Sequence, residues 1–350
     1  MTTSQRVFAA VLASLLTLPV FPPQPVAGQD AQSSAVPEPE LLRRLANLGD
    51  SLSKAGQFSG VILLARSGSP IFQRAYGLAD RARSLPNNTE TAFDLGSINK
   101  VFTQIAIQQL VGTGKLELDS TLSRYWPDYP NPDVAHRVTI RQLLQHKSGI
   151  GGDIFGDPAS GNRHDIRGLK DFLPLFVGEP LQFEPGSQTA YSNAGYIVLG
   201  LLIERISGQN YYDYVREHIF QPAGMTRTAS FAPDSLPANT AIGYTQRAAD
   251  GSSASTLRPN TTQLPGRGSS AGGGYSTAGD LLKFLNALRA RRIENGLPAG
   301  LGIAGGAPGI NATVDGDLPG GYDLIVLANL DPPAAQRVAR TVRPWLGGRD

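Results

Sequence analysis

A serine and a lysine three residues apart are the pair in this 350-residue chain whose types and spacing point most directly to chemistry. Ser97 and Lys100 lie in the run Asp94-Leu-Gly-Ser-Ile-Asn-Lys-Val-Phe-Thr103, which has the pattern of a helix start. Residues three apart on a helix share a face, so the amine can reach the hydroxyl. A serine hydroxyl needs a nearby base to act as a nucleophile, and a helix start favours developing negative charge. The pair therefore predicts a hydrolase that works through an acyl-serine intermediate.

A second copy of this tetrad, from Ser51 to Lys54, is a weaker candidate. It ends a helical pattern and is followed by Gly56, which suits a helix C-terminus. It therefore lacks the N–H groups of a helix start, and we interpret it as surface.

A tyrosine motif further along the chain strengthens the case for Ser97. Tyr191-Ser-Asn193 follows the turn Phe183-Glu-Pro-Gly186 and precedes an apolar helical pattern. Tyr129-Pro-Asn131 has the same form, but it lies in a proline-rich loop and we interpret it as a decoy.

Strand and helix patterns occupy different parts of the sequence. Strand-like runs at 58–65 and 71–78 flank the turn at 67–70 and predict a hairpin. Two more strands are expected at 310–314 and 322–329, joined by a turn containing Asp315-Gly316. The helices are expected at 40–54, 100–111, 139–144, 193–206, 211–220, 277–291 and 333–346. The polar segment 232–274, with proline and glycine throughout, predicts a long irregular loop.

Strands at both ends and helices in the middle indicate an α/β (α+β) fold. The simplest arrangement is one antiparallel sheet flanked by helices, with an inserted and mostly helical lobe. We expect a single domain at 40–346, with a sheet lobe at about 40–95 and 271–346 and a helical lobe at about 96–270. A site between the lobes is the default pocket.

Five segments, taken together in their order and spacing, resemble the serine β-lactamase/penicillin-binding superfamily. They are similar to its class C-like branch, which includes esterases and D-amino-acid peptidases, and the resemblance covers about residues 40–346. It implies a β-lactamase/transpeptidase-like fold. The segments are Gly96–Thr103, Leu143–Gly149, Tyr191–Asn193, Gly273–Ala278 and Gly305–Gly309.

The resemblance implies a role for each matching residue. Ser97 matches the nucleophile, Lys100 the amine that activates it and Tyr191 the phenol that shuttles the proton. Asn193 matches the side chain that positions the substrate and the lysine. Lysine and tyrosine both have reference pKa values near 10, so one pKa must be lowered for base catalysis near neutrality. The sequence leaves open whether Lys100 or Tyr191 takes the serine proton.

The third family motif is where this chain departs from the pattern. A triplet led by lysine or histidine is replaced by Ile303-Ala304-Gly305. Neither Ile303 nor Ala304 can pair with a substrate carboxylate, which argues against efficient hydrolysis of β-lactams. Gly305 and Gly306 match substrate-binding positions, and the backbone N–H of Gly306 can still join that of Ser97 in an oxyanion hole.

Two other motifs suggest alternatives. Gly268-Ser-Ser-Ala-Gly272 matches the nucleophile elbow of α/β-hydrolases, but it follows Pro265-Gly266 and no histidine follows His218. We interpret this region as a glycine-rich loop near the cleft, or else as a flexible linker. Lys147-Ser-Gly149 lies at a helix end and before Tyr191, so it is not the missing triplet, and His146 is interpreted as structural.

Composition excludes several other classes of function. The net charge is +2 and there is no long basic block, so we expect no nucleic-acid partner. There is no cysteine, which excludes disulfides and thiolate chemistry. The four histidines show no metal-ligand spacing, so we expect no metal and no cofactor. The oligomeric state is left open.

The N-terminus has the pattern of an export signal. Arg6 precedes the apolar run Val7–Phe21, and Val26-Ala-Gly28 supplies small residues for cleavage. We predict a signal peptide at 1–28, a mobile leader at 29–39 and a periplasmic or secreted protein with no stable membrane span after cleavage. A retained anchor is the alternative.

These observations predict an exported serine hydrolase that cleaves an ester, or an amide, of a small-molecule or peptide substrate. The alternatives are a D-amino-acid peptidase or weak β-lactamase on the same scaffold, and a non-catalytic, penicillin-binding-like module that recognises cell-wall peptide.

Overall fold

The computed structural model describes residues 36–152, 154, 163–247, 252–293, 296 and 300–347. The expected signal peptide at 1–28 and residues 29–35 of the expected leader lie outside these ranges. The N–H of Val36 donates to the Trp345 carbonyl at 2.9 Å. Helix α1 (Glu38–Lys54) then begins two residues before its expected start.

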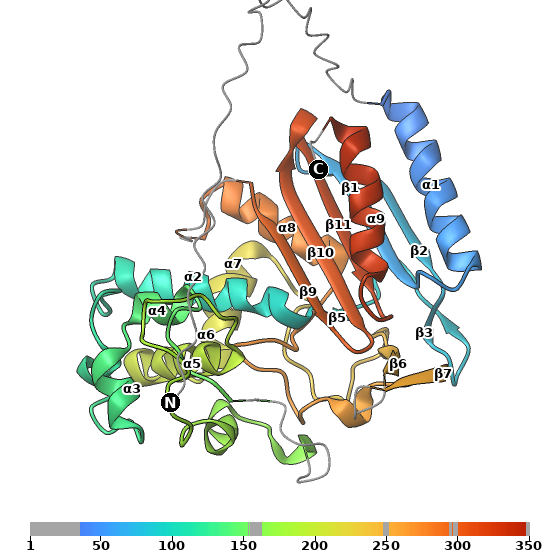
Figure 1. Ribbon diagram of the computed structural model, residues 1–350. Coiled ribbons are helices and arrows are strands. Elements are labelled where there is room, and N and C mark those ends of the chain that lie inside the picture. The colour runs from blue at the N-terminus through green and yellow to red at the C-terminus, as the bar shows by residue number, and fades with distance from the viewer. Residues whose placement is uncertain are drawn as a thin grey trace, which may run out of the picture. The chain divides into compact units, whose positions relative to one another are not determined.

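Strands from the two ends of the sequence form one five-stranded antiparallel sheet in the order β2-β1-β11-β10-β9 (Figure 1). Strand β1 pairs with β11 in the centre, with Leu63 opposite Ile325. The strands are β1 (Gly60–Arg66), β2 (Ser69–Tyr76), β9 (Gly302–Ala307), β10 (Ile310–Leu318) and β11 (Tyr322–Ala328). The antiparallel α/β architecture expected from the sequence is confirmed.

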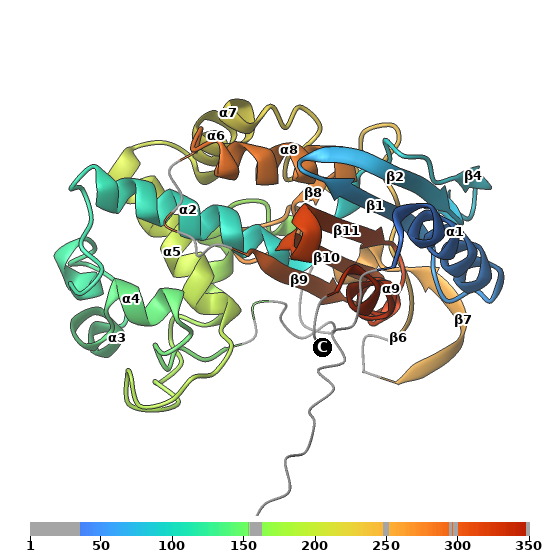
Figure 2. The ribbon, with the colours of Figure 1, turned by 90° about the horizontal axis from the view of Figure 1, so that it is seen from above.

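Both faces of the sheet are covered, and this explains the nearly continuous apolar run in β1. Val61 and Leu63 face one core, whereas Ile62 and Leu64 face the other, as the period of two in a strand requires. Figure 2 shows the sheet between α8 (Ala278–Arg289) on one side and α1 and α9 (Ala334–Val342) on the other.

The helical lobe is built around two buried helices, α2 (Asn99–Gly112) and α5 (Asn193–Ser207). Local signals fix the ends of α5, because the Ser192 hydroxyl accepts the Gly195 N–H at 3.0 Å and Gly208 ends the helix with φ of 75°. The smaller helices of this lobe are α3 (Pro132–Arg137), α4 (Ile140–Leu144), α6 (Tyr211–Val215) and α7 (Gln221–Ala223).

Two pairs of short strands in the described ranges lie outside the large sheet. β5 (Phe93–Asp94) pairs with β8 (Tyr275–Ser276) immediately before the predicted nucleophile. β3 (Leu78–Asp80) pairs with β4 (Leu85–Pro86).

Two expectations about local structure were wrong. The segment 232–274 is not wholly irregular, because β6 (Tyr244–Arg247) pairs with β7 (Ser253–Pro259). Strand β7 is largely exposed, so no apolar alternation marks it in the sequence. The turn expected at Asp315-Gly316 lies instead at Pro319–Gly321. Asp315 lies inside β10, where it pairs with Leu324 and Gly302. Its carboxylate forms an ion pair with Arg343 at 2.8 Å.

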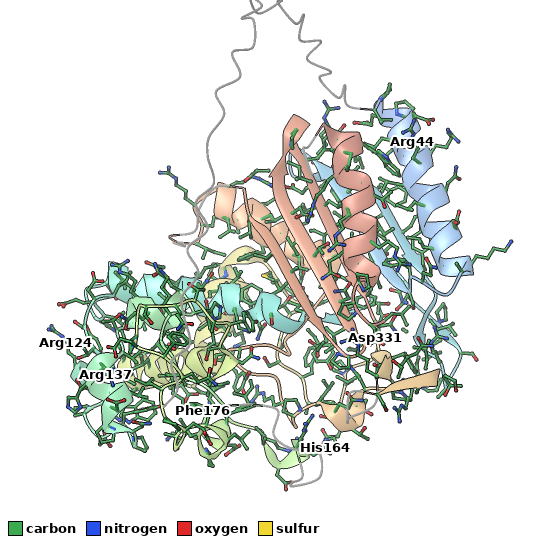
Figure 3. The ribbon with its side chains drawn as sticks, viewed as in Figure 1. Arg44, Arg124, Arg137, His164, Phe176 and Asp331 are labelled. Carbon is green, nitrogen blue, oxygen red and sulfur yellow. The ribbon has the colours of Figure 1, made fainter. Side chains whose placement is uncertain are left out.

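Several basic side chains on the surface are paired with acids. Figure 3 shows Arg44 at the end of the sheet lobe and both Arg124 and Arg137 on the far side of the helical lobe. Arg44 pairs with Glu40 at 2.8 Å, and Arg124 and Arg137 have their own carboxylate partners. No helix within the described ranges combines the length and apolar character needed to cross a bilayer.

Candidate active site

Ser97 lies in a single 3-10 turn, Gly96–Ile98, that leads directly into α2. The sequence predicted the first turn of a helix, and the tighter turn keeps Ser97 and Lys100 on one side. The Asp94 carboxylate accepts the Gly96 N–H at 2.8 Å, and the Leu95 N–H donates to the Gly274 carbonyl at 2.8 Å. These two bonds hold the strand-to-helix corner that presents the serine.

Lys100 is buried, with 5% of its surface exposed. Its Nζ lies 3.3 Å from Ser97 Oγ and 2.8 Å from Asn193 Oδ1, and it also donates to the Ala271 carbonyl. No carboxylate forms an ion pair with Lys100 within the described ranges, and burial lowers its pKa to about 7. A neutral amine has two N–H donors and one lone pair, which matches two carbonyl-type acceptors and one hydroxyl.

The Tyr191 hydroxyl donates to Ser97 Oγ at 2.6 Å. The side chain as a whole is 59% exposed, yet the burial of its hydroxyl end raises its pKa, partly opposed by the bond to Ser97. The Lys100 Nζ lies 4.7 Å from the centre of the Tyr191 ring. Ser97 Oγ is therefore within hydrogen-bond reach of both groups that the sequence proposed as its partners.

The segment around His146 fixes the position of the tyrosine motif. His146 Nδ1 accepts the Ser192 N–H at 3.1 Å, and its ring stacks on Tyr191. The Ser192 hydroxyl, which caps α5, donates to the Ile150 carbonyl at 2.9 Å. Burial and the nearby Lys100 lower the pKa of His146. The contact between His146 and Tyr191 is one that the sequence did not reveal.

Helix α2 also holds the glycine-rich loop of residues 268–274. Three successive carbonyls of this loop, from Ser269 to Ala271, accept bonds from Asn99 at 2.8 Å, Thr103 at 2.7 Å and Lys100. The loop lies beside the cavity described below, as one of the two sequence interpretations expected.

The serines of the nucleophile-elbow pattern are structural. Ser270 is fully buried and its hydroxyl donates to the Tyr196 carbonyl at 2.8 Å. The pattern lies in a loop rather than at a strand-to-helix elbow, which removes the α/β-hydrolase interpretation.

Strand β9 approaches Ser97 closely at two glycines. A Cβ atom on Gly305 would lie 2.0 Å from the Leu95 carbonyl oxygen and 3.0 Å from the Ser97 nitrogen. A Cβ atom on Gly96 would lie 3.0 Å from the Gly306 nitrogen. Because Gly96 and Gly305 have no side chains, the backbone around Ser97 and the backbone at Gly306 can approach each other closely at one edge of the sheet.

A cavity of about 280 Å³ opens over these groups. Ser97, Tyr191, Asn193 and Gly306 border it, and its walls are mainly apolar. The apolar lining comprises Ile154, Phe172, Leu264, Pro265, Ala307, Pro308 and Ile310. Asp94 is the one charged residue among the described residues that line it.

Ile303 does not border this cavity. It lies on β9 opposite Val314, is partly buried and packs against the larger apolar core. At the position that carries a cation in the family pattern, this chain therefore has an apolar side chain that packs against the core. In the part of the chain that the structure describes, no three His, Cys, Asp or Glu residues are grouped to hold a metal ion.

The two decoys lie away from the cavity. Ser51 and Lys54 are exposed at the C-terminal end of α1. Tyr129 is buried against Trp126, with ring centroids 5.0 Å apart.

A family model described as Beta-lactamase matches residues 45–334. The chain belongs to this family. Esterase EstB of Burkholderia gladioli is 31% identical over 343 residues, which cover 88% of this chain and 85% of that protein. A crystal structure of a penicillin-binding protein from Bacillus halodurans aligns with a TM-score of 0.71 and 34% identity, covering 84% of this chain and 98% of the other.

Penicillin-binding protein 4* of Bacillus subtilis (strain 168) is 34% identical over 188 residues, or 53% of this chain and 41% of that protein. The β-lactamase family match thus spans most of this chain, whereas the chain aligns with about half the length of the penicillin-binding proteins that it matches in Bacillus subtilis.

Proposed function

We propose that this protein hydrolyses esters, and more slowly amides, through an acyl intermediate on Ser97, with small or medium acyl groups as its substrates. The observation that carries this proposal is the placement of Ser97 Oγ within reach of Lys100 Nζ at 3.3 Å and Tyr191 Oη at 2.6 Å. Both contacts lie at the cavity that would receive the acyl group.

Lys100 is the better candidate for the base that takes the serine proton. Its lowered pKa leaves a large share of neutral amine near neutral pH, whereas the raised pKa of Tyr191 keeps that phenol protonated. The Ser97 proton passes to Lys100 Nζ as Oγ attacks the carbonyl carbon. Asn193 positions the amine, because its Oδ1 accepts from Nζ at 2.8 Å.

Tyr191 is suited to protonate the leaving group. Its hydroxyl gives a proton to the departing oxygen or nitrogen and regains one from Lys100, so the two groups are neutral again after acylation. Water then attacks the acyl-serine by the same route in reverse. The N–H groups of Ser97 and Gly306 would bind the oxyanion in both steps, and one such donor contributes about 10²–10³ to kcat in other serine hydrolases.

The cavity supports an acyl group that carries no carboxylate. Phe172, Ile310 and Leu264 offer no partner for a carboxylate, and Ile303 removes the cation of the family pattern. Efficient β-lactam hydrolysis is for this reason disfavoured. The replacement of that cation by Ile303 is also the observation that favours the second candidate, a non-catalytic binder of cell-wall peptide. A D-amino-acid peptidase or weak β-lactamase remains the alternative enzyme.

The experiment combines a fluorophosphonate probe with a chromogenic short-chain ester. Wild-type protein should be labelled and should turn over the ester, whereas Ser97→Ala should do neither. Ser51→Ala, in the decoy tetrad, is the matched control and should behave as wild type. Absence of labelling in the wild type, or equal turnover by wild type and Ser97→Ala, would contradict the proposed acyl-serine function.

We also propose that the protein is exported to the periplasm or secreted, on the pattern of residues 1–28. Fractionation of expressing cells and N-terminal sequencing test this. A start near Gln29 supports it, and an intact Met1 on the mature protein contradicts it.

A further inference from the structure

Asp94 is a charged side chain in the catalytic cavity for which the reaction above has no use. It is half-buried and is the one charged group among the described lining residues. Its neighbour on β5, Phe93, points into the large apolar core. Because successive side chains of a strand point to opposite faces, Asp94 points away from that core and toward the cavity.

The carboxylate of Asp94 has an incomplete set of partners. One oxygen accepts the Gly96 N–H at 2.8 Å, and no described residue forms an ion pair or a second hydrogen bond with the carboxylate. Its cross-strand neighbour on β8 is Tyr275, whose ring packs on Phe231 and carries no positive charge. The catalytic amine, Lys100, is already bonded to Ser97, Asn193 and Ala271.

An uncompensated carboxylate is unfavourable in an apolar cavity. Burial raises the pKa of Asp94 to about 7, opposed only by the bond from Gly96. A carboxylate without a counter-ion in an apolar cavity lowers the stability of the protein, and a cation brought by a ligand would supply the missing partner.

We propose that the cavity contains a subsite for a protonated amino group, with Asp94 as its counter-ion, and that the preferred substrates are aminoacyl esters or amides. This rests on the proposed acyl-serine function. The Asp94 carboxylate accepts the N–H of Gly96, the residue directly before Ser97. One peptide unit places the Cα atoms of Gly96 and Ser97 about 3.8 Å apart. The Asp94 carboxylate thus bonds to the turn that carries Ser97 and borders the same cavity, which suits an amino group on the acyl part of the substrate.

The charge of Asp94 can be removed without losing its backbone contact. In Asp94→Asn the amide oxygen can still accept the Gly96 N–H, so the corner that presents Ser97 retains its bond. Asp280→Asn is the control, since that carboxylate lies buried in the first turn of α8, pairs with Lys283 and lies outside the cavity.

The substrates should differ in the ammonium group alone. The methyl esters of alanine, in both enantiomers, and of isobutyric acid have nearly the same shape, with an ammonium in place of a methyl group. We expect wild-type kcat/KM to favour one alanine ester over the isobutyrate ester at least tenfold near neutral pH. Asp94→Asn should lower that ratio at least tenfold, and Asp280→Asn should leave it unchanged. An unchanged ratio in an Asp94→Asn protein that still reacts with the fluorophosphonate overturns the proposal.

A binding measurement separates this subsite from the catalytic proposal. Ser97→Ala lacks the nucleophile but retains the cavity, and its affinity for alaninamide and for isobutyramide can be measured by calorimetry. At least tenfold tighter binding of one alaninamide enantiomer supports the ammonium subsite even if the wild type proves to be no hydrolase. Equal affinity for the amine and its neutral analogue overturns the subsite, whatever the fate of the hydrolase proposal and even if Asp94→Asn fails to fold.

Discussion

His146 stacks on Tyr191, with ring centroids 4.6 Å apart and planes inclined by 28°. Its Nδ1 accepts the N–H of Ser192, so the imidazole holds both the ring of the tyrosine and the backbone that follows it. His146 touches no reacting atom. It acts as a positioning residue, because Tyr191 is 59% exposed and the His146 ring packs directly on its ring.

Loss of this contact should slow catalysis without weakening substrate binding. His146 has a φ of 57°, a conformation that asparagine tolerates, so His146→Asn removes the stacking with little backbone strain. We expect kcat for the ester to fall about tenfold, since a small misplacement of a proton donor is costly, while KM changes little. His218→Asn is the control, because His218 also stacks on a tyrosine, Tyr214, away from the cavity. An equal fall in both variants, or a change in KM alone, would contradict the positioning role.

Acylation should depend on pH through the amine of Lys100. The neutral amine is the active form and its pKa is lowered to about 7, so the rate of fluorophosphonate labelling should rise with pH and level off above that value. No falling limb is expected near neutrality, because the pKa of Tyr191 is raised. Lys100→Arg should label about 10²–10⁴ times more slowly, since a guanidinium stays protonated. A labelling rate that falls as pH rises from about 5 to 8 would exclude Lys100 as the base.

The close approach of β9 to Ser97 can be tested by adding one methyl group to the strand, at Gly305. In Gly305→Ala the new Cβ would meet the Leu95 carbonyl at 2.0 Å, so the strand must shift and separate the two oxyanion donors. We expect kcat to fall about 10²–10³-fold and the free energy of unfolding to fall by about 1–3 kcal/mol. Gly302→Ala on the same strand meets its nearest atom at 3.7 Å and should be harmless in both assays. Similar losses in the two variants would point to a general weakening of the strand.

Ile303 should keep the enzyme from using carboxylate-bearing substrates. We expect slow or absent turnover of nitrocefin by the wild type, because no cation lies at the family's third motif. Ile303→Lys should raise the ratio of nitrocefin turnover to ester turnover, with some loss of stability from the apolar packing of Ile303. Ile303→Leu controls for the change in packing. Fast nitrocefin hydrolysis by the wild type would show that the substrate carboxylate is held elsewhere.

The raised pKa of Asp94 also predicts a stability effect. The folded protein binds a proton at Asp94 up to about pH 7, whereas an unfolded chain releases it near 3.8, so stability is lost as pH rises through that window. Above pH ~7 the free energy of unfolding of Asp94→Asn should therefore exceed that of the wild type by about 1–4 kcal/mol, and this difference should vanish near pH ~4. Urea unfolding of both proteins at the two pH values measures it. A variant that is less stable than wild type at high pH would mean that the carboxylate has a favourable partner.

The catalytic groups could be found in the sequence because their spacing is local. Ser97 and Lys100 share one turn, and Tyr191 and Asn193 flank the cap of α5, so each pair is set by a helix start. That the two pairs meet depends on the packing of α2 against α5, which the resemblance implied and no local pattern encodes.

The contributions of His146 and Asp94 could not be foreseen in the same way. His146 reaches Tyr191 across 45 positions of sequence, through the fold of the segment after α4. Asp94 is distinguished by the side of β5 on which it lies, and two residues of strand show no readable alternation. The hairpin of β6 and β7 escaped notice because its side chains are mostly exposed.

The pairing of β1 with β11 has a consequence for how the molecule forms. The central rung of the sheet joins Leu63 to Ile325, so the sheet core cannot close until almost all of the chain is present. Such non-local pairing makes folding slow, because a long loop must be closed before its contacts contribute stability. The helices around Ser97 can form early from local signals, but the edge strand that carries Gly306 joins them only with the sheet. The oxyanion donor of Gly306 is therefore available to Ser97 only once the sheet has formed, so the complete site exists only in the assembled fold.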